Sequence, residues 1–234
     1  MREVWLADGV DRSAILDEIT DLAAGASVPV RTVNRARLQA AAETEAPQGV
    51  LAFAAPLPEA DIDELAAPAP AGPPPFLVVV DGLTDPHNLG ALLRTAQCAG
   101  ATGAVLGRHR AAHITATVAK AAAGAIEHLP IAVVPGIPAA LSRLADAGVW
   151  NVGLDAAATV PLWGLSVATE PVAIVLGAEG PGLSRLARAR CQLLIAIPQA
   201  GPLTSLNVAA AAALACFEVT RARPVSVDTP ARPG

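Results

Sequence analysis

The sequence contains few cysteines and no long apolar run. The three cysteines, Cys98, Cys191 and Cys216, are far apart, and none belongs to a CxxC pair. This spacing argues against a disulfide framework or a zinc site and is typical of a reducing cytoplasm. The longest apolar run, Val208–Phe217, is mostly alanine and much shorter than the roughly 18 residues of a membrane-spanning helix. Because the first residues also lack the apolar segment of a secretory signal, we expect a cytoplasmic protein with no membrane span and no metal.

Positive charge is also scarce. The chain has 16 Lys+Arg residues against 21 Asp+Glu residues, a formal net charge of −5, and Lys120 is its only lysine. This acidic balance argues against a protein that binds nucleic acid through charge alone. The other cations are arginines, whose planar fork suits phosphate groups. Any contact with nucleic acid must therefore come from local arginine patches.

The length and composition predict one large domain and one small one. A chain of 234 residues with 53% hydrophobic and 16% charged residues can form a sizeable core and is not globally disordered. The clearest boundary is AAPLPEADIDELAAPAPAGPPP, Ala54–Pro75, whose Pro- and Ala-rich composition is typical of a semi-rigid linker, with a surface loop as the alternative. We predict a small domain at residues 1–54, a linker at 55–75, a large domain at 76–223 and a disordered tail at 224–234.

Apolar runs alternate with helical patterns on both sides of this boundary. Before it we expect strands at Val4–Ala7, Val28–Val33 and Gly49–Phe53, and helices at Ser13–Ala24 and Arg35–Ala42. After it, FLVVV (Phe76–Val80) is a continuous apolar run, as expected of a strand buried on both faces. Further strands are expected at Ala104–Leu106, Ile131–Val134, Val149–Leu154, Val172–Leu176 and Leu193–Ile197. The alternation predicts an α/β fold with a mostly parallel sheet covered by helices.

Ligands of such sheets bind beyond the carboxyl ends of the strands, where three loops carry unusual residues. The first loop, DGLTDPHN (Asp81–Asn88), leads into an amphipathic helix that we expect Asn88 to cap. Arg94 lies off the apolar stripe of this helix, four residues after Gly90. Since helical side chains lean toward the N-terminus, we expect Arg94 to pass over that glycine toward the strand ends. An ordinary solvated arginine is the alternative.

The second and third loops differ in character. LGAEGPGLS (Leu176–Ser184) has its glycines in the order G-x-x-G-x-G, which is not the fingerprint of a dinucleotide site. A tight turn with one carboxylate, Glu179, favours a ligand held by backbone contacts. The third loop, IPQAGPLTSLN (Ile197–Asn207), enters an Ala-rich helix that Ser205 or Asn207 can cap.

Together, these loops resemble a known family. DGLTDPHNLGALLRTAQCAG, VLGAEGPGLS and IPQAGPLTSLNVAAAAALACFE are similar, in order and spacing, to the three signature motifs of the SpoU/TrmH family of RNA ribose 2′-O-methyltransferases in the SPOUT superfamily. KAAAGAIEHLP, between the first two motifs, is similar too, and the resemblance covers Phe76–Arg223. The first 54 residues resemble the family's small RNA-binding domain, which has a ribosomal-protein-like fold, although Pro47 stands where a histidine is usual.

The resemblance implies a C-terminal trefoil knot that holds S-adenosylmethionine, and a homodimer. Leu176, Gly177, Ala178, Ile197 and Leu206 are then expected to contact this cofactor, and Arg94 to act across or near the dimer interface. Arg94 would act on the ribose hydroxyl, with Asn88, Glu179, Ser205 and Asn207 positioning the reactants. Because a guanidinium normally stays charged, stabilisation of the forming alkoxide is physically easier for Arg94 than acting as a free base.

The favoured partner is ribosomal RNA, with methylation of a guanosine ribose in the large-subunit RNA. Candidate RNA contacts are Arg31, Arg35 and Arg37, then Arg108, His109, Arg110 and His113, and finally Arg185, Arg188 and Arg190. Two alternatives stay open, namely a tRNA ribose methyltransferase and a non-catalytic RNA-binding or ribosome-assembly protein of the same fold. Arginine patches do not separate the RNA substrates, since both RNAs offer the same phosphates and 2′-hydroxyls.

Overall fold

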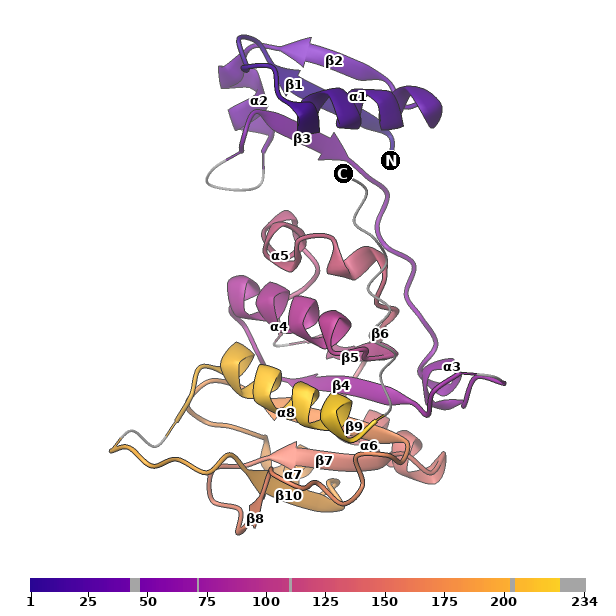
Figure 1. The fold of residues 1–234 in the computed structure, drawn as a ribbon, viewed down its shortest axis with the longest axis vertical. Coiled ribbons are helices and arrows are strands. Elements are labelled where there is room, and N and C mark those ends of the chain that lie inside the picture. The colour runs from indigo at the N-terminus through magenta and orange to yellow at the C-terminus, as the bar shows by residue number, and fades with distance from the viewer. Residues whose placement is uncertain (43–46, 71, 110, 203–204, 224–234) are drawn as a thin grey trace. The chain divides into compact units, whose positions relative to one another are not determined.

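The computed structural model describes residues 1–42, 47–70, 72–109, 111–202 and 205–223. The chain divides into two compact units, Met1–Pro58 and Glu59–Gly234, and each is described by itself (Figure 1). The predicted tail at residues 224–234 lies outside the described residues. Strands and helices alternate in both units, as the apolar runs predict.

The first unit contains a small mixed sheet. Its elements are β1 (Glu3–Ala7), α1 (Ala14–Gly25), β2 (Val30–Val33), α2 (Arg35–Ala41) and β3 (Val50–Phe53). The strand order is β2-β1-β3, with β1 parallel to β2 and antiparallel to β3. Ala7, Val33 and Leu38 form the core of this unit. Asn34 caps α2 by accepting a hydrogen bond from the backbone N–H of Arg37 at 2.7 Å.

The second unit is built on a seven-stranded sheet within the part of the chain that the structure describes. Its strands are β4 (Phe76–Asp81), β5 (Gly103–Gly107), β6 (Ile131–Val134), β7 (Trp150–Leu154), β8 (Val160–Pro161), β9 (Val172–Gly177) and β10 (Leu193–Ala196). Its helices are α3 (Ile62–Ala66), α4 (Pro86–Cys98), α5 (Ala116–Ala122), the 3₁₀ turn η1 (Ala125–Glu127), α6 (Ile137–Asp146), α7 (Arg185–Arg188) and α8 (Val208–Ala222). The order is β6-β5-β4-β9-β7-β10-β8, and all neighbouring strands are parallel. The predicted mostly parallel sheet is therefore confirmed.

Helices cover both faces of this sheet (Figure 1). Leu77 and Val79 of β4 belong to a core cluster that includes residues of α3, α6 and α7. On the other face, α4 packs against α5 and α8. Burial on two faces explains why β4 reads as an uninterrupted apolar run: each residue of Phe76–Val80 is at most 1% exposed.

Part of the predicted linker forms a short helix in the second unit. Ile62–Ala66 form α3, and Asp61 caps it by accepting from the backbone N–H of Asp63 at 2.7 Å. Ile62 and Ala66, one helical turn apart, are 3% and 4% exposed in the same cluster as α6. The composition alone did not predict this helix, which forms because the apolar spacing of Ile62 and Ala66 outweighs the surrounding Pro- and Ala-rich composition.

Two local predictions for α4 are corrected. Asp85, not Asn88, is the N-cap: Oδ1 of Asp85 accepts from the backbone N–H of His87 at 3.0 Å, and Pro86 is the first helical residue. Proline suits that position because its missing N–H has no helical partner there. Gly90 does not make room for Arg94. A Cβ at Gly90 would lie 2.7 Å from the carbonyl oxygen of Val118, so this glycine permits the close approach of α5.

The described residues lack two features that the composition also argues against. None of the helices in this part of the chain is long and apolar enough to cross a lipid bilayer. Within the same residues, His, Cys, Asp and Glu side chains form no group of three or more that could hold a metal ion.

Candidate active site

Two of the three predicted loops leave neighbouring strands at one edge of the sheet. β4 and β9 pair along their length, and their register places Asp81 opposite Gly177. From β4 the chain extends the sheet through β5 and β6 on one side, whereas β9, β7 and β10 lie on the other. α/β sheets bind ligands at the carboxyl ends of strands, where the strand order reverses in this way. The fold therefore provides a binding edge where the sequence predicts one.

One residue from each loop joins a hydrogen-bonded triad of Asn88, Glu179 and Asn207. Nδ2 of Asn88 donates to Oε1 of Glu179 at 2.8 Å. Nδ2 of Asn207 donates to Oδ1 of Asn88 at 2.9 Å and to Oε1 of Glu179 at 3.1 Å. Asn88 and Asn207 are 119 positions apart in the sequence. The fold thus connects three side chains that local sequence patterns treat separately.

Asn207 also joins the triad to α8. Its Oδ1 accepts hydrogen bonds from the backbone N–H groups of Ala209 at 2.9 Å and Ala210 at 3.3 Å, so Asn207 is the N-cap. This is one of the two caps that the sequence predicts. Because its amide nitrogen bonds both Asn88 and Glu179, the whole polar end of the Asn207 side chain is engaged. The N-terminus of α8 therefore holds the other two triad residues in place.

The glycine-rich loop folds back on itself directly after β9. The backbone N–H of Ala178 donates to the carbonyl of Gly182 at 3.1 Å, and that of Gly182 donates to the carbonyl of Ala178 at 2.9 Å. At Gly177 an added Cβ would lie 2.1 Å from the carbonyl carbon of Gly182 and 2.2 Å from the backbone nitrogen of Leu183. These are backbone atoms, so only glycine fits at position 177.

A cleft lies between the segments that follow β7, β9 and β10. The five residues predicted to contact a cofactor all line it, namely Leu176, Gly177, Ala178, Ile197 and Leu206. Glu179 and Ser205 line it as well, together with Leu154, Asp155, Gln199 and Val208. Aliphatic side chains beside a few polar groups and exposed backbone are typical of a site for a small organic molecule. One end of the triad, Glu179, therefore borders a binding cleft.

Arg94 lies apart from these residues. It is exposed on α4 and is not among the described residues that line the cleft. Within the described part of the chain its guanidinium has no hydrogen bond or ion pair. The structure thus gathers Asn88, Glu179, Ser205 and Asn207 around the cleft and leaves Arg94 on the surface.

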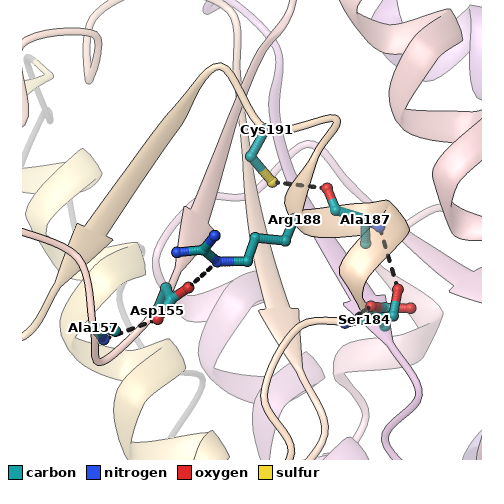
Figure 2. A network of polar contacts seen from close by, with 7 residues as sticks. Asp155, Ala157, Ser184, Ala187, Arg188 and Cys191 are labelled. Atoms are coloured by element: carbon teal, nitrogen blue, oxygen red, sulfur yellow. Dashed lines mark hydrogen bonds and ion pairs between the residues drawn. The ribbon is translucent and has the colours of Figure 1, made fainter.

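Sequence reasoning did not single out Asp155, which lines the cleft. Asp155 follows β7, and its Oδ2 pairs with Nε of Arg188 on α7 (Figure 2). The hydrogen bond from Arg188, followed by one from the backbone N–H of Ala157, holds the pKa of the Asp155 carboxyl below its usual value. The signal for Asp155 was present, since it directly follows a predicted strand at the carboxyl edge.

Several arginines of the predicted RNA patches are engaged within the chain. Arg31 pairs with Glu3, and Arg108 pairs with Glu59 at 2.9 Å. The guanidinium of Arg37 lies 4.9 Å from the ring centroid of Trp5. Arg110 lies outside the described residues. These patches consequently carry less unpaired positive charge than the sequence implies.

Comparison with known proteins bears on both units. The model of the SpoU rRNA Methylase family matches residues 75–217, and the model of RNA 2′-O ribose methyltransferase substrate binding matches residues 1–60. Two relatives named 23S rRNA (guanosine-2′-O-)-methyltransferase RlmB are each 39% identical to this chain. The alignment with the Photobacterium profundum protein covers 90% of this chain and 84% of the relative; that with the Shewanella oneidensis protein covers 94% and 89%.

A solved structure has the same fold. The crystal structure of the SpoU methyltransferase AviRb from Streptomyces viridochromogenes, in complex with the cofactor AdoMet, has a TM-score of 0.77 at 24% sequence identity. The match covers 94% of this chain and 82% of that one. The family and the enzyme class predicted from the three motifs are confirmed by these findings. The chain belongs to the SpoU rRNA Methylase family.

Proposed function

We propose that this chain transfers a methyl group from S-adenosylmethionine to the ribose 2′-hydroxyl of a guanosine in 23S ribosomal RNA, in the cytoplasm. The meeting of Asn88, Glu179 and Asn207 beside the cleft carries this proposal. Relatives that carry this activity in their names match across both units of the chain. We also propose that the second unit is tied in the trefoil knot expected of its family.

The cleft suits the cofactor. Its aliphatic walls, Leu176, Ile197 and Leu206 among them, match an adenine ring, and the glycine-rich loop brings its backbone to the same cleft at Gly177 and Gly182. When bound, S-adenosylmethionine supplies an electrophilic methyl group on a positively charged sulfur. The protein must then align the accepting hydroxyl and stabilise charge on its oxygen.

The triad gives Glu179 a defined role. Both amides of the triad donate to its Oε1, so that oxygen is saturated. Within the described residues Oε2 has no hydrogen-bond partner, and a carboxylate oxygen can accept from the hydroxyl or base of an RNA nucleotide. We assign the orientation of the substrate to Glu179, and the orientation of Glu179 to Asn88 and Asn207. Ser205, which is exposed and also lines the cleft, adds a hydroxyl group to it.

Replacing Asn207 by aspartate separates its two tasks. The Asn207→Asp variant keeps an oxygen that caps α8 but loses the amide that bonds Glu179, and places two carboxylates side by side. We expect the melting temperature to change little and the rate of methyl transfer to fall by about 100-fold or more, since the loss of one positioned hydrogen bond in an active site costs 10²–10³.

The matched control for this variant is Asn34→Asp. Asn34 caps α2 through the same type of hydrogen bond, in the other unit. Its melting temperature and rate should stay within about twofold of the wild type, as is usual for exchange between two good N-cap residues. An Asn207→Asp protein with the wild-type rate would contradict the role given to the triad.

We propose a homodimer in which α8 forms part of the interface and Arg94 of one copy serves the cleft of the other. Leu214 and Phe217 of α8 are 37% and 49% exposed, and they lie three residues apart on one face of the helix. α8 packs beside α4, which carries Arg94. An apolar stripe next to a catalytic cation fits a site completed by a second copy.

The Phe217→Glu substitution is expected to dissociate this dimer. Burial of a phenylalanine contributes about 1.5–3 kcal/mol, and a buried carboxylate adds a further cost, so the dissociation constant should rise at least about tenfold. Sedimentation velocity at micromolar protein measures this shift. The control Leu22→Glu replaces an apolar residue that is 66% exposed on α1 and should leave the mass unchanged. A monomeric wild-type protein would overturn this part of the proposal.

Labelled S-adenosylmethionine tests the substrate. Incubation with unmodified 23S ribosomal RNA and, separately, with unmodified tRNA should label only the former. Label on tRNA alone would contradict 23S ribosomal RNA as the substrate and identify tRNA instead. Label on neither RNA, from a protein that binds the cofactor, would favour a non-catalytic RNA-binding protein.

A further inference from the structure

The wall of the cleft contains a carboxylate that the proposed mechanism does not use. Asp155 and Glu179 are the charged residues among the described lining residues, and Glu179 belongs to the triad. The Asp155 side chain is 18% exposed, so it is largely removed from water. A carboxylate in such a place needs partners, because burying an uncompensated charge is costly.

A connected set of contacts fixes the position of Asp155 (Figure 2). Its Oδ1 accepts from the backbone N–H of Ala157 at 2.8 Å, and its Oδ2 pairs with Nε of Arg188. Arg188 is the last residue of α7, whose N-cap Ser184 accepts from the backbone N–H of Ala187 at 3.2 Å. The backbone N–H of Ser184 in turn donates to Asp81 at the end of β4, at 2.7 Å. These hydrogen bonds anchor α7 to the end of β4 and restrict the movement of Arg188.

The charge of the Asp155–Arg188 pair indicates what it would bind. The guanidinium already neutralises the carboxylate, so a second cation gains little from it. Each carboxylate oxygen still has an unused lone pair, because an ionised carboxylate offers about four acceptor positions. Neutral hydroxyl donors suit such a group, and carboxylates bind the ribose hydroxyls of dinucleotide cofactors in the same way.

We propose that Asp155, oriented by Arg188, accepts hydrogen bonds from the ribose hydroxyls of S-adenosylmethionine. This inference rests on the proposed function, because it assigns one part of the same cofactor site. Asp155 is then a residue for cofactor affinity, and Arg188 is a positioning residue that acts through it. The triad at Glu179 serves the substrate, and Asp155 serves the cofactor.

Binding of two ligands, measured by calorimetry, tests this assignment. S-adenosylhomocysteine has the ribose, the adenine and the amino-acid part, whereas 5′-methylthioadenosine lacks the amino-acid part but keeps the ribose. The Asp155→Asn variant retains an acceptor for the backbone N–H of Ala157 and loses the charge. We expect both ligands to bind about 10- to 100-fold more weakly to it, as for the loss of hydrogen bonds to a charged group.

The Asp63→Asn variant is the matched control. Asp63 pairs with Arg143 at 2.7 Å on the surface, and its side chain is 69% exposed. Removing the charge there breaks the same kind of ion pair away from the cleft and should leave both affinities within about twofold, as exposed pairs contribute little. Arg188→Gln should weaken both ligands less than Asp155→Asn does, because the carboxylate remains.

A ligand without ribose hydroxyls tests the assignment on the wild-type protein as well, so the result does not depend on whether a variant folds. On the wild-type protein, 5′-methylthioadenosine that lacks its ribose hydroxyls should bind about tenfold or more weakly than the parent compound. On Asp155→Asn the two compounds should bind equally, because the partner of the hydroxyls is gone. If removal of the ribose hydroxyls weakens binding to Asp155→Asn by the same factor as binding to the wild type, the hydroxyls contact another group and the inference is overturned.

The remaining outcomes distinguish failure of the proposed function from failure of the role given to Asp155. A wild-type protein that binds neither S-adenosylmethionine nor S-adenosylhomocysteine contradicts the proposed function itself. A wild-type protein that binds both, together with an Asp155→Asn variant of unchanged affinity, overturns only the assignment of Asp155. Loss of S-adenosylhomocysteine binding with 5′-methylthioadenosine unaffected would assign Asp155 to the ammonium group instead and would also overturn the ribose assignment.

Discussion

The Arg94→Ala variant is expected to transfer methyl groups about 10²- to 10³-fold more slowly than the wild type while binding S-adenosylmethionine with unchanged affinity. Removal of one group that stabilises a forming oxyanion has an effect of this size. The cofactor affinity stays constant because Arg94 is not among the described residues that line the cleft. Single-turnover rates with ribosomal RNA and calorimetry with the cofactor measure the two quantities separately.

Arg143→Ala is the control for Arg94→Ala. Arg143 is another surface arginine. Its guanidinium pairs with Asp63, and the proposed mechanism gives it no role. Its rate should stay within about twofold of the wild type, as for other surface substitutions. An Arg94→Ala protein with the wild-type rate would refute the role of this residue, whatever the behaviour of the triad.

Mixing two variants shows which copy supplies Arg94. Arg94→Ala retains an intact cleft, and Gly177→Ala retains an intact Arg94. If the arginine acts across the dimer, a mixture of the two inactive proteins forms heterodimers with one complete site and regains part of the activity. Lack of any recovery, once exchange of subunits has been verified, would mean that each copy supplies its own arginine.

The Gly177→Ala substitution is expected to abolish measurable cofactor binding. The added Cβ would lie 2.1 to 2.3 Å from backbone atoms of Gly182 and Leu183. The backbone cannot yield as a flexible side chain does, so the loop must open, with a cost of about 1–3 kcal/mol in the free energy of unfolding. Gly177, Ala178 and Gly182 all line the cleft, and opening the loop therefore displaces the groups that hold the cofactor.

Gly136→Ala is the matched control for Gly177→Ala. A Cβ at Gly136 meets no atom within 4 Å, and its φ of −159° is open to any residue. This variant should bind S-adenosylmethionine with the wild-type affinity and unfold within about 1 kcal/mol of the wild type, as other substitutions without a steric conflict do. Cofactor binding by Gly177→Ala at wild-type strength would contradict the geometry described for the glycine-rich loop.

The sheet was predictable because its central strands are short, continuous runs of apolar residues in the sequence. Phe76–Val80 and Val172–Leu176 are continuous apolar runs, and the structure buries both on two faces. α3 was missed because Ile62 and Ala66 lie in a segment that is rich in proline and alanine, a composition that does not mark a helix. A packed helix of five residues leaves little periodic signal.

The residues that meet beside the cleft could be named from the sequence, but the hydrogen bonds between them could not, and Arg94 lies apart from them. The rule that ligands bind at the carboxyl ends of strands leads to all three loops, and the motifs identify Asn88, Glu179 and Asn207. Their mutual hydrogen bonds span 28 to 119 positions, a separation over which local patterns carry no information. The N-cap of α4 was assigned wrongly because Asn88 and Asp85 are both good caps, and only Pro86 decides between them.

Alkaline hydrolysis of the labelled product tests the central claim, methyl transfer to a ribose 2′-hydroxyl, most directly. Alkali cleaves RNA through attack of the 2′-hydroxyl on the neighbouring phosphate, so a methylated 2′-oxygen blocks cleavage at that one linkage. After reaction with labelled S-adenosylmethionine and ribosomal RNA, the label should remain in an alkali-resistant dinucleotide whose first nucleoside is guanosine. Label released entirely in mononucleotides would place the methyl group on a base and would contradict the account given for Arg94, Glu179 and their neighbours.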